Sequence, residues 1–528
     1  MLGQQVEERI MQHFRTKRLS AMEGGRLTLA FLLVILLSPP VLAGTSEDTV
    51  VLETWESAVL NGGKAGFVHT VVRSVERDGQ KILHTTSELD LTVQRFNDTA
   101  RIYMETGTDE TEAGKVIGVS MRQLIGKTQQ LILTGTVEDG QLHVKMQGGP
   151  PMDKKIRWSP QVVGLYREQT LFQDKKVKPG DKFSYLHYEP LVNAVLSINV
   201  EVKDFEEISI AGAAKERALR AVATPDPIMG VQLPGTTLWL DKKLNVVRSQ
   251  TQMEGMGQLE LVRTTKALAL KKATGGANIT NIGTRQLISL NRRLPNSPEE
   301  VVYRITLQED KEPATSFARD DRQQVANTKD KSFELRVKAI RRAESSDKDA
   351  KAADEFLESN YYINSADEKV QELARQAVGR EKDPWRKAQR IENWVSKRMH
   401  FTYDEQMATA DHVARTLEGD CTECAMLSAA MCRAVGIPSR TAIGLIYAEP
   451  KEAGRRPTLA FHMWTEVWID GRWLAIDATL GQGSVGADHL KITDHSWQGV
   501  QSVMPLLPVT RVMLGKAKVE VLSVKGED

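Results

Sequence analysis

The chain has 528 residues, which is too long for a single hydrophobic core and predicts two or three domains. Apolar residues make up 41% and charged residues 26%, the balance of an ordinary globular protein. The formal net charge of +1 lacks the basic excess of a protein that binds nucleic acid through its charge, so we predict no nucleic-acid partner.

Residues 1–43 have the pattern of an export signal. A polar segment that contains basic residues precedes a nearly unbroken apolar run at 27–37, and Val41-Leu42-Ala43 before Gly44 suits cleavage by a signal peptidase. The apolar run is short for a spanning helix. We therefore expect an exported protein of the periplasm or cell envelope, with residues 1–43 serving as a cleaved signal or, alternatively, as an anchor in the membrane.

Residues 44–272 show one strand signal after another. In the segment 196–203, apolar and polar residues alternate strictly, which is typical of a strand with one buried face. The pairs Asn61-Gly62 and Asp139-Gly140 predict tight hairpin turns. We expect an antiparallel β-sheet domain and interpret it as a scaffold, although a curved sheet could also hold a ligand in its concave face.

The remaining chain is predicted to form two further units. Residues 273–345 contain strand patterns at 301–307 and 333–337 and end in a charged linker. Residues 346–528 begin with helical patterns at 366–378 and after Asp383-Pro384, where the aspartate suits a helix cap. The overall prediction is an α+β protein whose N-terminal region is rich in antiparallel β-sheet.

A cysteine lies at a predicted helix start. Asp420 suits the N-cap, apolar residues recur at helical spacing from Cys421 to Val435, and Gly436-Ile437-Pro438 ends the pattern. Unpaired backbone N–H groups and the positive end of the helix dipole favour a thiolate at such a position. The sequence therefore indicates that Cys421 is reactive.

A histidine and an aspartate follow on neighbouring strand patterns. His462 lies in the strand pattern 460–468, Gly471-Arg472 reads as a turn, and the pattern 473–477 ends at Asp477. Across this hairpin His462 and Asp477 are predicted to face each other, and Cys421 would complete a set of nucleophile, base and orienting carboxylate.

These blocks resemble a known family. Gly-Asp-Cys-Thr-Glu at 419–423, His-Met-Trp-Thr-Glu at 462–466 and Ile-Asp-Ala-Thr at 476–479 look like the core of the transglutaminase-like superfamily. The resemblance covers about the last third of the chain and implies a papain-like cysteine fold. It implies Cys421 as the nucleophile, His462 as general base and acid, and Asp477 as the residue that orients the histidine. The sequence has no acidic spacing of an EF-hand, and we predict no metal and no cofactor.

One position departs from that family. Position 424, an aromatic residue or a histidine in many members, is Cys424, and the resulting Cys-x-x-Cys is also a thioredoxin-type redox motif. The redox interpretation does not account for His462 and Asp477, so we predict that Cys424 and Cys432 pack in the helix interior. A zinc site is excluded because Cys432 lies about 16 Å along the helix from Cys421.

The predicted reaction is acyl transfer or hydrolysis on the carboxamide or peptide bonds of a protein or peptide substrate. Trp464 and Gln482 are predicted to line the cleft, and His489 and His495 are predicted to lie on the surface. The alternative is an exported binding or scaffold protein that uses the same fold without catalysis. The sequence does not indicate the natural substrate or the oligomeric state.

Overall fold

The computed structural model describes residues 49–525 except 78, 96–97, 126–128, 150–151, 211–214, 229–230, 254–255, 272–286, 343–349, 404–406, 450–455 and 501–503. The predicted signal or anchor at 1–43 lies outside these residues. Within the described part of the chain, no helix is both long and apolar enough to cross a membrane.

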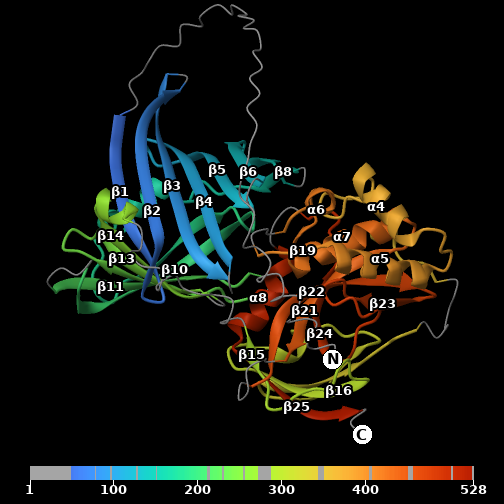
Figure 1. The fold of residues 1–528 in the computed structure, drawn as a ribbon. Helices are drawn as coiled ribbons and strands as arrows, with labels where there is room; N and C mark the ends of the chain where they lie inside the picture. Colours follow the sequence, from blue (N-terminus) through green and yellow to red (C-terminus); the bar gives the residue numbers. More distant parts are fainter. Residues whose placement is uncertain are drawn as a thin grey trace, which may run out of the picture.

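The first half of the described chain forms one 14-stranded sheet, drawn in blue to green in Figure 1. Every pair of neighbouring strands in it is antiparallel, and its order is β8-β7-β6-β5-β4-β3-β2-β1-β14-β13-β12-β11-β10-β9. The strands are β1 (Thr49–Leu60), β2 (Gly63–Arg77), β3 (Gln80–Arg95), β4 (Asp98–Thr111), β5 (Val116–Ile125), β6 (Gln129–Glu138), β7 (Gln141–Gln147), β8 (Met152–Arg157), β9 (Lys182–Glu189), β10 (Ala194–Ile208), β11 (Glu216–Pro225), β12 (Thr236–Leu240), β13 (Val246–Met253) and β14 (Gly257–Thr264).

The predicted hairpin turns of this sheet are confirmed. Asn61 and Gly62, which join β1 to β2, have φ angles of +52° and +82°. Asp139 and Gly140, which join β6 to β7, have φ angles of +49° and +70°. Two successive positive φ angles match the right-handed twist of the strands that they connect, and asparagine, aspartate and glycine accept this conformation at low cost.

The sheet curls, so that its two edges approach each other. Helix α2 (Leu165–Asp174) lies between β8 and β9 in the sequence, and the backbone N–H of Val163 donates to the carbonyl of Leu186 on β9 at 2.8 Å. Tyr188 of β9 packs in one core with Leu133 and Leu142 of β6 and β7. Side chains from both edges of the sheet therefore share one core at this point.

The second half of the described chain is organised around two smaller sheets. One has the order β15-β22-β21-β24, with β23 paired to β22, and the other has the order β17-β18-β16-β25. The strands are β15 (Ile288–Ser289), β16 (Glu300–Leu307), β17 (Gln323–Lys329), β18 (Ser332–Lys338), β21 (Ser439–Ala448), β22 (Thr458–Ile469), β23 (Arg472–Ile476), β24 (His489–His495) and β25 (Ala517–Lys525). Figure 1 shows β25, near the C-terminus, beside β16, which it pairs with in antiparallel register.

The helices cover the sheet that carries β21–β24. They are α4 (Glu368–Val378), α5 (Pro384–Arg398), α6 (Ala410–Thr416) and α7 (Cys421–Ala434), with α3 (Lys266–Leu270) and α8 (Leu507–Leu514) elsewhere in the chain. Helix α7 is buried along most of its length, and its small side chains let α4, α5, α6 and β22 approach it closely. A second core joins the β16 sheet to β21, β22 and β24 through Leu445, Leu459 and Leu490. The predicted helices and the α+β class are confirmed.

Candidate active site

Helix α7 begins at Cys421 because hydrogen bonds of two acidic side chains fix its first turn. The carboxylate of Asp420 accepts the N–H of Thr422 at 2.8 Å, and the carboxylate of Glu423 accepts the N–H of Asp420 at 3.0 Å. This capping box satisfies N–H groups that a helix start leaves unpaired. Gly419 has a φ angle of +146°, and a Cβ there would lie 2.3 Å from Cβ of Glu423, so only glycine fits. The predicted helix start and its Asp420 cap are confirmed.

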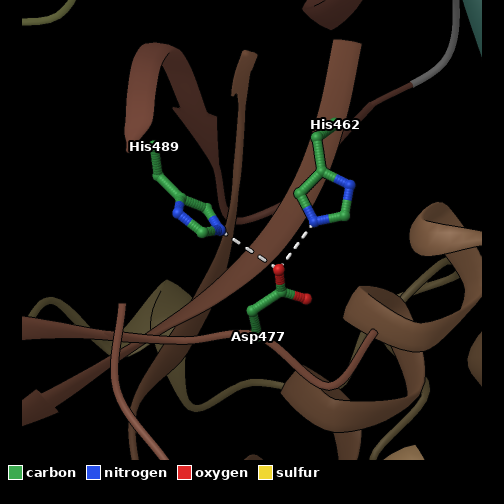
Figure 2. Close-up of side chains that lie close together, drawn as sticks. All are labelled: His462, Asp477 and His489. Carbon is green, nitrogen blue, oxygen red and sulfur yellow. Dashed lines mark hydrogen bonds and ion pairs between the residues drawn. The ribbon is translucent and has the colours of Figure 1, made fainter. Parts of the chain in front are cut away.

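The β22–β23 hairpin brings a histidine and an aspartate together. His462 lies on β22, and Asp477 directly follows β23. His462 Nε2 is 2.7 Å from Asp477 Oδ2, and both side chains are buried (Figure 2). Because an ionised carboxylate only accepts hydrogen bonds, Nε2 carries the hydrogen and Nδ1 is left for a second partner. The predicted contact across the hairpin is confirmed.

Cys421 and His462 are close enough to influence each other's proton affinity. His462 lowers the pKa of the Cys421 thiol, and Cys421 raises the pKa of His462. Thr465 Oγ1 donates to the carbonyl of Ala425 at 3.0 Å, which fastens β22 to the first turn of α7. Cys421 is partly exposed, whereas His462 and Asp477 are buried, so the sulfur is the most accessible of the three groups.

Burial is the largest influence on proton binding at this site. It raises the pKa of Cys421, and the charge of Asp420 raises that pKa further, whereas His462 lowers it. Burial alone would lower the pKa of His462, but the charges of Asp477 and Cys421 raise it to about 10. Burial alone would raise the pKa of Asp477, but His462 and His489 hold it well below its usual range. Asp477 therefore favours the imidazolium form of His462, and the positive charge of that form lowers the pKa of Cys421 against the effect of burial.

The contribution of the helix start to thiolate formation at Cys421 stays a prediction. The structure adds two effects that oppose it, because burial and the charge of Asp420 both raise the pKa of the thiol. The extent of burial depends on how densely the chain packs around the sulfur, which local sequence does not reveal. It is the charge of His462 that lowers the pKa of the thiol.

The other two cysteines are part of the core. Cys424 and Cys432 are buried in the cluster that surrounds α7, and all three cysteines are free thiols. Burial raises the pKa of Cys424 and of Cys432 well above the usual thiol value, which makes both poor nucleophiles. Their predicted packing role is confirmed.

Trp464 does not line an accessible surface, contrary to the prediction. Its side chain is 0% exposed, and its ring stacks over His462 with 6.3 Å between centroids. It sits in a small apolar cluster with Ala442 and Ala475 because β22 turns this face toward the protein interior. Gln482 is partly exposed in the loop after Asp477, and its predicted contact with substrate stays a prediction.

His489 was missed by the sequence reasoning, which predicted a surface position. It is fully buried at the start of β24, and its Nε2 lies 3.2 Å from the same Asp477 oxygen that binds His462 (Figure 2). Its Nδ1 lies 2.9 Å from Oδ1 of Asp488. The sequence gave no indication of this contact, because it depends on the pairing of β24 with β21.

The three facing atoms of His462, Asp477 and His489 lie within 4.8 Å of one another, close enough in principle to hold a metal ion. Tetrahedral zinc, about 2.0–2.1 Å from each ligand, would hold the ligands about 3.3 Å apart. The observed contacts of 2.7 and 3.2 Å are ordinary hydrogen bonds. We therefore interpret the cluster as a hydrogen-bonded set.

A buried glutamate supports the Asp477 loop from another element. Glu392 of α5 accepts the backbone N–H of Asp477 at 3.2 Å and that of Gly483 at 3.0 Å through the same oxygen. Burial is the main reason that the pKa of Glu392 rises to about 8. Helix α5 thereby fixes the loop that carries the orienting carboxylate.

Comparison with known proteins identifies the region around this site. Residues 371–478 match the model of the transglutaminase-like superfamily. No curated protein matches the chain.

Solved structures match parts of the chain at low similarity. A proposed cysteine protease from Cytophaga hutchinsonii is 17% identical over 44% of this chain and 90% of its own, with a TM-score of 0.28. A β-barrel-like protein of the domain of unknown function DUF1849 from Brucella abortus is 11% identical over 40% and 95%, with a TM-score of 0.31. The periplasmic domain of TgpA from Pseudomonas aeruginosa, bound to ethylmercury, is 15% identical over 35% and 91%, with a TM-score of 0.24. These values transfer no activity to the chain. Residues 371–478, which contain Cys421, His462 and Asp477, belong to the transglutaminase-like superfamily.

Proposed function

We propose that the chain is a transglutaminase-like cysteine enzyme that performs acyl transfer or hydrolysis on carboxamide or peptide bonds. The observation that carries this proposal is the position of His462, which lies 2.7 Å from the buried carboxylate of Asp477 and whose pKa is raised by both Asp477 and Cys421. A nucleophile, a proton carrier and an orienting carboxylate in this order are what covalent catalysis by a thiol requires.

The proposed reaction has two steps. In the first, the thiol proton of Cys421 passes to His462, the sulfur attacks the carbonyl carbon, and the C–N bond breaks as His462 gives that proton to the leaving nitrogen. Ammonia or an amine departs, and a thioester remains. In the second step an amine or water attacks the thioester, His462 takes up its proton, and the sulfur leaves as the thiolate. Asp477 holds the imidazole ring in orientation and stabilises its charged form during both steps.

The proposed substrate is a protein or peptide. Its carboxamide or peptide bond must reach the sulfur of Cys421, because His462 and Asp477 are buried. The partly exposed edge of the cysteine suits a side chain or an extended segment that is presented from solvent. We propose export to the periplasm or cell envelope from the signal pattern of residues 1–43, so envelope proteins are the candidate substrates.

Trapping the thioester tests the proposal. The full chain is incubated with a library of glutamine- and asparagine-containing peptides, quenched in acid, and searched by mass spectrometry for an acyl adduct on the peptide that contains residue 421. We expect the adduct in the wild type and in Cys424→Ala, and its loss in Cys421→Ala. A biotinylated primary amine, added in a parallel reaction, separates transfer to an amine from hydrolysis.

Failure would have a definite meaning. If no peptide is captured and iodoacetamide alkylates all three thiols at uniformly slow rates, Cys421 is not an activated nucleophile, and the chain is better described as a binding or scaffold protein. An adduct on Cys424 would equally overturn the assignment.

A further inference from the structure

His489 lies between two carboxylates. Its Nε2 faces Asp477 Oδ2 at 3.2 Å, and its Nδ1 faces Asp488 Oδ1 at 2.9 Å, while its side chain is 0% exposed. An ionised carboxylate has only acceptor atoms, so each of these contacts requires a hydrogen on the imidazole nitrogen. A neutral imidazole has a single N–H. With both carboxylates ionised, the geometry therefore requires His489 to be an imidazolium.

This cation shares an oxygen with the proposed general base. Figure 2 shows His462 and His489 approaching Asp477 Oδ2 from two sides, and the two rings lie 5.9 Å apart between centroids. Trp464 closes the space beside them, with its ring 5.3 Å from that of His489 in an edge-on contact. Both rings are buried, so solvent screens their charges from each other only weakly.

We propose that His489 is a positioning residue, whose permanent positive charge holds Asp477 in place beneath His462 and offsets part of the carboxylate's attraction for the His462 proton. This inference rests on the proposed function of the Cys421 site. Without the second cation, Asp477 would bind the protonated ring of His462 more tightly and make the transfer of its proton to a leaving amine more costly.

The groups that face His489 come from several elements. On β22 the titratable group is His462, after β23 it is Asp477, and on the chain before β24 it is Asp488. Beyond Asp488, the Arg322 guanidinium interacts with that carboxylate, and the carboxylate helps to raise the pKa of the Tyr303 phenol. The two nearest charges are thus both negative, and the pKa of His489 is raised by Asp488 and Asp477 although burial opposes this.

Two measurements on the full chain test the proposal without any substrate. Nuclear magnetic resonance of ring-labelled histidine reports the protonation state of each imidazole, with the signals assigned through His462→Gln and His489→Gln. The wild-type His489 signal should be that of a doubly protonated ring from pH 5 to pH 9. In His489→Gln, which retains an N–H donor of similar reach but no charge, the titration midpoint of His462 should rise by about one to two pH units. His143→Gln in the N-terminal sheet is the matched control and should leave that midpoint unchanged.

Several results would overturn the idea. A singly protonated His489 at pH 7 would do so in the wild type, even if the His489→Gln variant fails to fold. A folded variant with an unchanged His462 midpoint would reduce His489 to a packing residue. A wild-type titration that shifts on treatment with EDTA, or on addition of zinc, would assign the cluster to a metal ion instead. Asp488→Asn provides a second variant, in which His489 should lose its extra proton at lower pH than in the wild type.

These outcomes remain separate from the fate of the proposed function. If peptide capture at Cys421 fails while the His462 midpoint moves as expected, the electrostatic role of His489 stands and the acyl-transfer reaction does not. If capture succeeds and the midpoint stays fixed, the enzyme stands and the role of His489 does not.

Discussion

The most informative single perturbation concerns Glu392, because its backbone contacts hold the Asp477 loop. Its pKa rises from the usual 4.5 to about 8, which corresponds to about 5 kcal/mol between its two protonation states. A group whose folded pKa is raised contributes stability that is fully present below its unfolded pKa and is lost as the pH rises through its folded pKa. Glu392 should therefore make the loop progressively less stable from pH 4.5 to pH 8.

Glu392→Gln should remove this pH dependence. The glutamine carbonyl can still accept the N–H groups of Asp477 and Gly483, and it carries no charge to desolvate. We expect the loop to be equally stable in the variant and the wild type near pH 4.5. At pH 8 the free energy of opening the loop should be about 4 kcal/mol higher in the variant. In contrast, Glu392→Ala leaves two backbone N–H groups without an acceptor and should cost about 1–3 kcal/mol for each at any pH.

Local hydrogen exchange is the appropriate assay, since a chain of several domains does not unfold as one unit. Exchange is followed by mass spectrometry on the peptide that spans residues 474–484, and each variant is compared with the wild type at the same pH so that intrinsic exchange rates cancel. An advantage of 4 kcal/mol appears as about a thousandfold slower exchange. If Glu392→Gln loses protection as Glu392→Ala does, or if the difference from wild type is the same at pH 5 and pH 8, the assigned role of the buried carboxyl is refuted.

Three further outcomes can be checked with single substitutions. Asp420→Asn keeps a good helix cap but removes the charge that raises the pKa of Cys421, so alkylation of that thiol by iodoacetamide should begin at lower pH; an unchanged profile would contradict the assigned cause. Asp477→Asn should lower the pKa of His462 from about 10. In the wild type this pair contributes stability below pH 6.5 that is lost as the pH rises toward 10, whereas the melting temperature of the variant should not change with pH over that range. Lys491→Met should cost about 3–5 kcal/mol of local stability, measured by hydrogen exchange around β24, because this buried ammonium contacts three carboxylates, of which Arg440 still pairs with Glu466 and Asp494; a loss below 1 kcal/mol would show that Arg440 compensates for the missing ammonium.

Some of the site follows from local sequence. The Asp420-Cys421-Thr422-Glu423 run places the cysteine at a helix start because a capping box needs only residues within one turn. The contact of His462 with Asp477 spans 15 positions of one hairpin, so strand alternation and a single turn were enough to predict it. The turns at Asn61-Gly62 and Asp139-Gly140 were predictable for the same reason, since each depends on the conformational preference of two residues.

Other features were decided only by the tertiary structure. Glu392 accepts the backbone N–H of Asp477 from 85 positions away, and His489, which was predicted to lie on the surface, contacts Asp477 from β24. The burial of Trp464 and the raised pKa of Cys421 depend on how completely the helices and sheets exclude water, which is a property of the packed molecule. The sequence by itself thus determined which residues could form a nucleophile, base and carboxylate set. Packing determined how strongly each of them holds its proton, because the charges and the dielectric surroundings that fix proton affinity come from elements far apart along the chain.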